Sequence, residues 1–181
     1  TRLVLTARRA ERLDELKAEV EALGNAAAIV PGDITVTGSS AEPELQAQSV
    51  SGSIEATDVS AGRLTLSTVS GDVILAGVTS SEANITSVSG DVESGGTLAA
   101  DGRYELRSHS GDVRVLVAEE VGFDVDASTF SGRIRTDLSI VMERVNIDSR
   151  RRRSLEGRFG EGGAILDLTT FSGSITITTQ K

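Results

Sequence analysis

Cysteine and tryptophan are absent from this 181-residue sequence, and histidine, tyrosine and methionine each occur once. Without cysteine there can be no disulfide and no thiolate metal site. The single histidine, His109, excludes a paired-histidine catalytic site and a multi-histidine metal site. No apolar run approaches the roughly 20 residues that a helix needs to span a bilayer. The sequence therefore predicts no cofactor and no membrane span.

Positive charge is scarce in the middle of the chain. The net charge is −9, and residues 36–141 carry 6 basic residues against 16 acidic ones. An acidic surface repels phosphate backbones and anionic lipids, so the composition argues against nucleic acid and anionic membranes as partners. The one basic run, residues 150–153, is expected on a solvated loop or strand that faces the acidic copies.

A repeated phrase is the clearest signal that the sequence does contain. It is typified by residues 68–73, which read TVSGDV, and its Ser-Gly pairs begin at positions 51, 70, 89, 110, 131 and 172. The spacings of 19, 19, 21, 21 and 41 indicate a period near 20, with one degenerate copy in the last interval. A fixed period of this length is typical of solenoids. We predict a mainly β, single-chain β-solenoid of about seven rungs, with the degenerate corner near Gly157.

Apolar and polar residues alternate on both sides of each Ser-Gly pair, as in residues 64–68 and 73–75. This period of 2 predicts strands with one buried face, and copies stacked about 4.8 Å apart would form a continuous aliphatic core. Glycine permits a sharp corner, and stacked serine hydroxyls could form a ladder there. The residue before each serine forms a mostly apolar column, expected to pack at the corner or on a second face. The predicted structural-turn residues are Ser51, Gly52, Ser70, Gly71, Ser89, Gly90, Ser110, Gly111, Ser131, Gly132, Ser172 and Gly173.

Residues 1–35 differ in pattern from the repeats. Short strands are predicted over 3–6 and 26–30, and four apolar residues between 13 and 23, spaced by 3, 4 and 3, predict a helix over about 10–23. Such a β-α-β unit could cap the first edge of the solenoid, which would otherwise be open. We therefore expect a helical cap over 1–35 and a β-solenoid repeat domain over 36–181.

Residues 3–9, 11–13 and 31–35 resemble the second strand, the following helix and the third strand of short-chain dehydrogenases. The resemblance implies that Arg8 would meet the 2′-phosphate of NADP and that Asp33 with Ile34 would lie beside the adenine. This stretch contains no glycine-rich phosphate loop. The only tyrosine, Tyr104, is not followed by the lysine of the family's Tyr-x-x-x-Lys motif. An alternative interpretation of the chain is thus a remnant or fusion of a dehydrogenase without activity.

The repeats carry a second resemblance. The Ser-Gly-Asp-Val phrases, the segment 103–108, the arginine run 150–153 with its glycine-rich sequel, and the ending Ser-Gly-Ser-Ile-Thr-Ile resemble the bacterial putative-adhesin family of β-solenoid domains over about residues 34–181. The resemblance implies a non-enzymatic structural or adhesive module, often envelope-associated, whose partner is an unknown protein or surface. Open solenoid ends would allow self-association. The chain is expected in the cell envelope or outside the cytoplasm if a leader was lost, and in the cytoplasm otherwise.

Acidic residues supply the remaining site candidates. Asp72, Asp91 and Asp112 hold equivalent places in successive copies, where stacked carboxylates could share Ca²⁺. We expect them instead to face solvent and to hydrogen-bond to the turn. Carbohydrate binding is a further alternative, although few aromatic residues are present to stack on sugars. Glycosidase chemistry would need two carboxyls across a cleft, for which Glu119 with Glu120, or Asp124 with Asp126, are candidates. The sequence predicts no enzyme and assigns no catalytic, cofactor-binding or metal residue.

Overall fold

The computed structural model describes residues 3–6, 26–30, 32–38, 40–118, 121–148 and 152–179. All regular secondary structure among these residues is β-strand, which confirms the mainly β prediction. The helix predicted over 10–23 lies outside the described residues. The strands are β1 Leu3–Thr6, β2 Ala26–Val30, β3 Ile34–Thr37, β4 Ser40–Ser51, β5 Ile54–Thr57, β6 Ser60–Ser70, β7 Val73–Ser89, β8 Val92–Ser110, β9 Val113–Val117, β10 Phe123–Thr129, β11 Ile134–Thr136, β12 Val141–Asp148, β13 Arg152–Phe159, β14 Ala164–Thr170 and β15 Ile175–Thr179.

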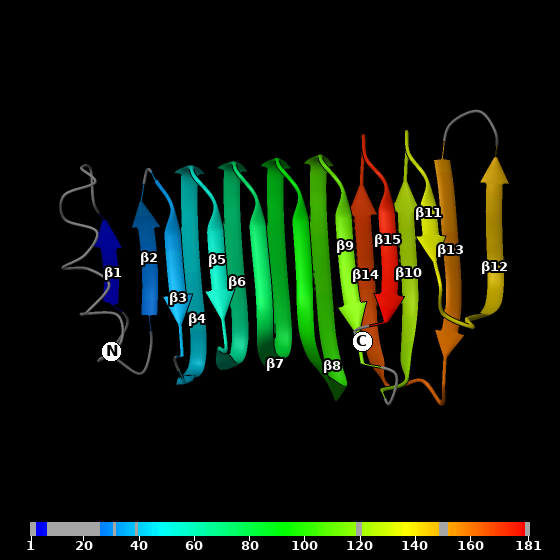
Figure 1. Cartoon of the computed structure of the whole chain (residues 1–181), viewed down its shortest axis with the longest axis horizontal. Helices are drawn as coiled ribbons and strands as arrows, with labels where there is room; N and C mark the ends of the chain where they lie inside the picture. The colour runs from blue at the N-terminus through cyan, green and yellow to red at the C-terminus, as the bar shows by residue number, and fades with distance from the viewer. Residues whose placement is uncertain are drawn as a thin grey trace.

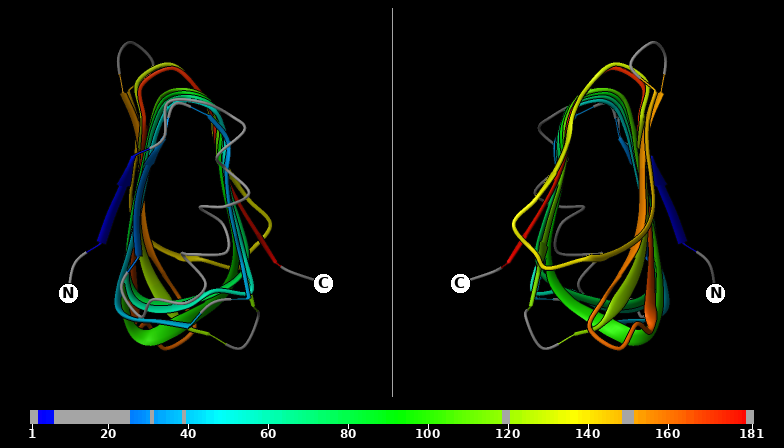
Figure 2. Two further views of the ribbon diagram at one scale, coloured as in Figure 1. Left: turned by 90° about the vertical axis from the view of Figure 1, so that its left-hand side faces the viewer. Right: turned by 90° about the vertical axis from the view of Figure 1, so that its right-hand side faces the viewer.

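The strands form a solenoid of parallel coils that stack along the long axis of the molecule (Figure 1). Each coil runs along one side, turns at a Ser-Gly corner and returns along a second side. On the first side β4 pairs with β6, β6 with β7, and β7 with β8. Leu64 of β6 lies opposite Ala83 of β7, so the 19-residue repeat of the sequence is one coil. Viewed end-on, the coils superimpose (Figure 2).

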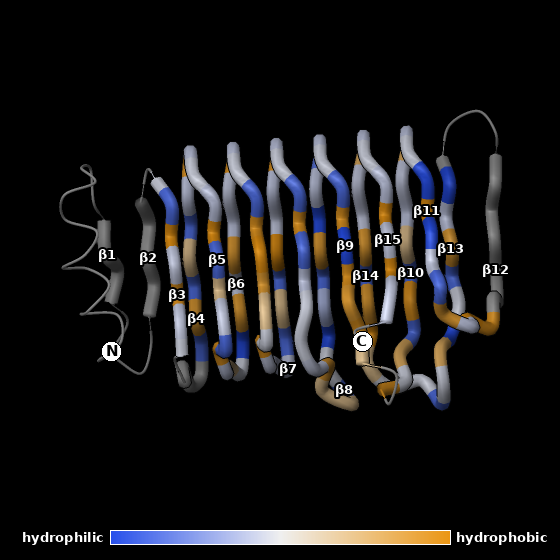
Figure 3. Tube along the Cα trace, viewed as in Figure 1, coloured by the Kyte–Doolittle hydropathy of each residue, from blue (hydrophilic) through white to orange (hydrophobic). Residues whose placement is uncertain are grey.

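Inward-facing side chains stack into aliphatic columns between the two sides. Apolar and polar residues alternate along the strands (Figure 3), because successive side chains point to opposite faces of a strand. The column before the corner comprises Ala47, Leu66, Ile85, Leu106, Leu168 and Ala127, and the column after it comprises Ile54, Val73, Val92, Val113 and Ile175, all at most 1% exposed. This core needs no aromatic anchors, which explains how so few aromatic residues suffice.

The spatial order of the coils differs from their order in the sequence. β14 pairs with β8 on one edge and with β10 on the other, while β15 lies between β9 and β11. The last coil of the sequence, residues 164–179, is therefore inserted between the coil of residues 103–117 and that of residues 123–136 (Figure 1). The spatial order of the coils therefore departs from the sequence order at this end of the molecule.

In the described residues of the long final interval, the chain forms a hairpin and no degenerate coil. β12 and β13 are antiparallel, and β13 pairs antiparallel with β10, with Gly157 opposite Val125 in the middle of the strand. The prediction of a corner near Gly157 is therefore wrong. Gly157 fits an antiparallel strand because it is buried against β10 and needs no side-chain room there.

The N-terminal strands continue the same sheet. β1 and β2 occupy the two predicted segments and are parallel, β2 pairs with β4, and β3 pairs with β5. Gly32 lies between β2 and β3 and stacks against Gly52, as the other corner glycines stack on their neighbours. The stack is Gly32, Gly52, Gly71, Gly90, Gly111, Gly173 and Gly132 in spatial order, which confirms a solenoid of about seven rungs. The seventh corner is Gly32, which the sequence pattern had placed in the N-terminal unit.

Candidate interaction surface at the Ser-Gly corner

The corner is built from glycines because adjacent coils approach each other closely there. A Cβ atom on Gly71 would lie 2.2 Å from the carbonyl oxygen of Gly52, and one on Gly111 would lie 2.1 Å from that of Gly90. Real Cβ atoms essentially never come so near a backbone oxygen. Every coil therefore has to place glycine at the same point, and this steric rule produces the period that is visible in the sequence.

A ladder of buried hydroxyls runs beside the glycines. The Thr68 hydroxyl donates to the carbonyl of Gly52 at 3.0 Å, and the Ser87 hydroxyl donates to that of Gly71 at 3.1 Å. The same bond recurs in each coil, three residues before its glycine, at Ser49, Ser108, Thr170 and Thr129. The serines of the Ser-Gly pairs are exposed, so the ladder is not formed by the residues that the sequence suggested. A hydroxyl residue at this position in all six copies was the signal that could have revealed it.

Replacing Thr68 with valine keeps the side-chain shape but leaves the Gly52 carbonyl without its donor. We expect a loss of about 1–2 kcal/mol in the free energy of unfolding, measured by urea denaturation. Replacing the exposed Ser70 with alanine should change stability by less than about 0.5 kcal/mol. Equal effects of the two substitutions would show that the buried ladder does not stabilise the corner.

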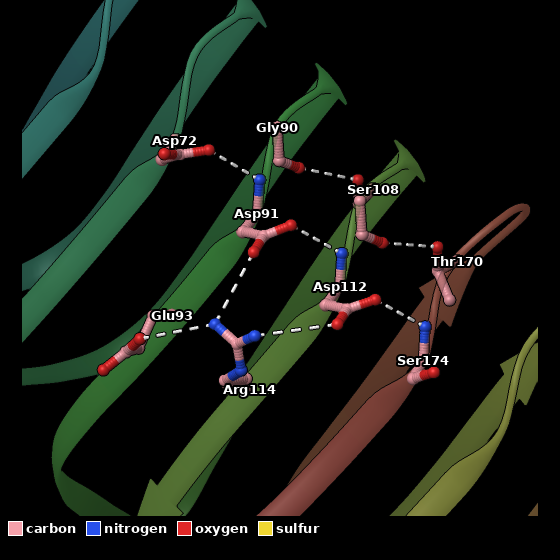
Figure 4. A network of polar contacts seen from close by, with 10 residues as sticks. Asp72, Gly90, Asp91, Glu93, Ser108, Asp112, Arg114, Thr170 and Ser174 are labelled. Atoms are coloured by element: carbon pink, nitrogen blue, oxygen red, sulfur yellow. Dashed lines mark hydrogen bonds and ion pairs between the residues drawn. The ribbon is translucent and has the colours of Figure 1, made fainter.

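The three aspartates form a second ladder on the outer side of the corner (Figure 4). Asp72 Oδ1 accepts a hydrogen bond from the backbone N–H of Asp91 at 2.8 Å, and Asp91 Oδ1 accepts one from Asp112 at 2.9 Å. Asp112 Oδ1 accepts from the N–H of Ser174 at 2.8 Å, so the ladder continues into the inserted coil. Each carboxylate thus binds the turn of the next coil.

An arginine supplies the positive charge beside these carboxylates. The Arg114 guanidinium lies 3.5 Å from Asp91, 3.6 Å from Asp112 and 3.9 Å from Glu93 (Figure 4). All four side chains are partly exposed, so each ion pair contributes little to stability. In the part of the chain that the structure describes, no group of three or more histidines or acids is placed to bind a metal ion.

Of the two candidate glycosidase pairs, Glu119 and Glu120 lie outside the described residues, and Asp124 and Asp126 do not lie across a cleft. Asp124 forms an ion pair with Arg158, in which Oδ1 and Nε are 2.6 Å apart. Asp126 lies two residues further along the same strand, so both side chains point to one side of the sheet. Glu156 and Arg158 of β13 are directly opposite this pair. The two carboxylates therefore share one surface of the sheet and do not face each other across a cleft.

An apolar ridge follows the residue before each corner serine. We call this row of Val50, Val69, Val88, His109, Phe171 and Phe130 the corner ridge. Its valines and phenylalanines are 44–57% exposed, and they make up five of the eight large hydrophobic side chains exposed among the described residues. The apolar column was visible in the sequence, but it was expected to pack against the protein and instead faces outward.

The inserted coil completes an aromatic stack within this ridge. Phe171 lies between His109 and Phe130, with ring centroids 5.0 and 4.8 Å away and interplanar angles of 8° and 3°. In sequence order His109 would be followed by Phe130, so the stack depends on the out-of-order insertion. Because the rings cover one another's faces, they present mainly edges to solvent, which does not favour stacking on a sugar.

The only tyrosine is a structural residue of the irregular part of β8. The Tyr104 hydroxyl donates to the Ser80 carbonyl at 2.5 Å and accepts from the N–H of Ala99 at 2.7 Å. Burial raises the pKa of Tyr104 above 10.0, while the hydrogen bond from Ala99 acts in the opposite direction. The folded protein therefore holds this proton more tightly than the unfolded chain does.

This raised pKa predicts a loss of stability at alkaline pH. Above pH 10 the unfolded chain releases the phenol proton before the folded protein does, so the stabilisation present below pH 10 declines as pH rises through the folded-state pKa of Tyr104. Tyr104→Phe should cost about 1–2 kcal/mol at pH 7. It should also flatten the fall in urea midpoint between pH 9 and 11.5. An unchanged slope in the variant would show that Tyr104 does not cause the alkaline loss.

Coils in register, a glycine corner and a buried hydroxyl ladder define a β-solenoid repeat protein. Comparison with models of known protein families identifies the family of this chain. The chain belongs to the Toastrack DUF4097 family, whose model matches residues 15–178. This match confirms the family resemblance of the repeats, and it does not support the resemblance of residues 1–35 to dehydrogenases.

A solved structure similar to this chain is described as a "putative cell adhesion protein" from Clostridium sporogenes. The two are 12% identical with a TM-score of 0.32, over 71% of this chain and 56% of the other, so this chain spans just over half the length of that protein. No curated protein matches the chain. Within the described ranges, there is no helix with the length and apolar character of a membrane span.

Proposed function

We propose that this protein is a non-enzymatic, adhesion-type structural module of a bacterial cell envelope, and that the corner ridge is its contact surface. The observation that carries the proposal is the concentration of exposed apolar side chains in one row. A soluble surface rarely aligns such residues without a partner, and exposed apolar patches mark interaction sites.

The ridge is suited to contact with an extended partner surface. Its six side chains come from neighbouring coils, so their spacing is set by the backbone at about 4.8 Å and the row is roughly 24 Å long. The stacked rings and the glycine corner fix the row rigidly, which lowers the entropic cost of ordering it on binding. A single narrow row buries less area than a standard interface, so many weak contacts in parallel would give the adhesion.

The test measures adhesion of purified protein coupled to fluorescent beads. Retention of the beads on cells of the source bacterium is compared for the natural chain, for the triple variant Val50→Ser, Val69→Ser and Val88→Ser, and for Ile74→Ser. Losing three half-buried contacts of about 1 kcal/mol each should lower retention at least tenfold. Ile74 is 41% exposed on the other side of the corner and serves as the matched control, with unchanged retention.

The outcomes separate the two parts of the proposal. Equal retention of the triple variant and the natural chain would place the contact elsewhere on the solenoid. Retention of the natural chain no greater than that of uncoated beads would contradict adhesion itself. Envelope association is tested independently by fractionating cells of the source bacterium, where detection of the protein only in the cytoplasm would contradict it.

A further inference from the structure

The inserted coil occupies a slot whose two walls both precede it in the sequence. All seven residues Phe123–Thr129 of β10 pair with β14, and Arg103–Ser108 of β8 pair with its other edge. β15 is held in the same way, between β9 and β11. We call the space between these walls the coil slot. It is formed by residues 103–117 on one side and 123–136 on the other.

The coil slot separates two parts of the solenoid. Among the described strands, β10 pairs only with β13 and β14, and β11 pairs only with β15. Residues 123–159 are therefore joined to the preceding coils by backbone pairing only through residues 164–179. With the slot empty, both walls would be open strand edges, which readily pair with another strand.

Specific bonds at the corner select what fills the slot. Thr170 donates its hydroxyl to the Gly111 carbonyl at 2.9 Å, and the N–H of Ser174 donates to Asp112 Oδ1 at 2.8 Å. From the opposite wall, the Thr129 hydroxyl donates to the carbonyl of Gly173 at 2.8 Å. Phe171 then fits between the two rings of the corner ridge. Every one of these contacts joins the coil to one of its two walls, and none involves the link that leads into the coil.

The connection into the inserted coil is rich in glycine. Gly160, Gly162 and Gly163 have φ of 61°, 79° and 133°, and they join β13 to β14. This link passes close to the link between β9 and β10, because a Cβ atom on Gly122 would lie 2.6 Å from the Gly162 carbonyl oxygen. Glycines of this kind allow the backbone to change direction, so the coil can leave along another path.

We propose that the coil slot also accepts residues 164–179 of a second copy of this chain, giving a dimer that exchanges its last coils. The exchanged coil makes the same bonds as the chain's own coil, so only the entropy of association and the link conformation distinguish the two states. Both walls precede the last coil in the sequence, so the last coils of different copies compete for the slot while it is open. A linked segment competes at an effective concentration in the mM range. Exchange is thus favoured when the chain refolds at high concentration.

Cysteine pairing tests this exchange directly, because the natural chain has no cysteine. Arg107 and Thr169 are opposite each other in β8 and β14. The single variants Arg107→Cys and Thr169→Cys, with different mass tags, are unfolded together, refolded at 10 µM to 1 mM and oxidised. Random pairing gives twice as much mixed disulfide as either homodimer. If the coils exchange, the mixed disulfide should exceed this random ratio. The excess should increase with protein concentration to at least fivefold over the random ratio.

The matched control uses Thr65→Cys and Asn84→Cys, which are opposite each other in β6 and β7 on coils that follow directly in the sequence. This pair should give the random ratio at every concentration. The double variant Arg107→Cys and Thr169→Cys in one chain should form an intramolecular disulfide, since facing strand residues lie within disulfide reach. A random ratio for the mixed singles, or failure of the double variant to cross-link, would overturn the proposal.

Discussion

Gly90→Ala is expected to lower the free energy of unfolding by about 3–4 kcal/mol. The new Cβ would lie 2.0 Å from the Gly71 carbonyl oxygen and 2.5 Å from its carbonyl carbon. Relief requires the two coils to separate at the corner, which stretches the hydrogen bond from the Ser87 hydroxyl to the Gly71 carbonyl. Urea denaturation followed by circular dichroism measures the loss.

Two further alanine substitutions separate the clash from backbone strain. Gly38 has φ of 58° with nothing within 4 Å of an added Cβ, so Gly38→Ala should cost only about 1–2 kcal/mol of backbone strain. The φ of Gly111 is not in the left-handed region, but an added Cβ would lie 2.1 Å from the Gly90 carbonyl oxygen. Gly111→Ala should therefore lower the free energy of unfolding by as much as Gly90→Ala. If Gly111→Ala were as mild as Gly38→Ala, the close stacking of the corner would not be the source of the penalty.

Leu168→Ala is expected to cost about 3–5 kcal/mol and to split unfolding into two transitions. Leu168 is completely buried in the inserted coil, which alone joins residues 123–159 by backbone pairing to the preceding described coils. Weakening this coil should let residues 123–159 lose protection first. Hydrogen–deuterium exchange measures this as faster exchange there than over residues 54–117.

Leu66→Ala provides the matched control, because Leu66 occupies the same core column in a coil that is stacked in sequence order and is 1% exposed. It removes the same atoms and should have a similar cost, but without early loss of protection over residues 123–159. The same exchange pattern in both variants would contradict the role of the inserted coil as the link between the two parts.

Local chemistry in the sequence was sufficient to predict the coil. A period of 2 on either side of Ser70-Gly71 specified which residues face inward, and the 19-residue spacing specified one coil, since parallel strands in register bring equivalent residues together. The same reasoning anticipated that Asp72 hydrogen-bonds at the turn. The bonds reach the next coil, because each turn stacks directly on its neighbour.

The direction in which the apolar residue before each corner serine faces was assigned wrongly from the sequence. Val69 and Phe171 belong to an apolar column, and apolarity alone favours burial, so the sequence suggested packing. The alternation of the strand continues through Thr68, whose hydroxyl points inward to the Gly52 carbonyl, and it places Val69 outward. Apolarity was thus given more weight than the period of 2, and the alignment of these residues as one exposed ridge became visible only in three dimensions.

The sequence by itself determined that the chain forms a β-solenoid, where six of its seven glycine corners lie and which side chains form the core, because these depend on contacts that repeat in the successive coils. Only the tertiary structure decided the order of the coils. Residues 123–129 have an edge that fits any strand of the repeat pattern, and the antiparallel hairpin of β12 and β13 covers the other edge. That arrangement brings residues 164–170 back between coils that precede them, a long-range pairing on which a local repeat carries no information.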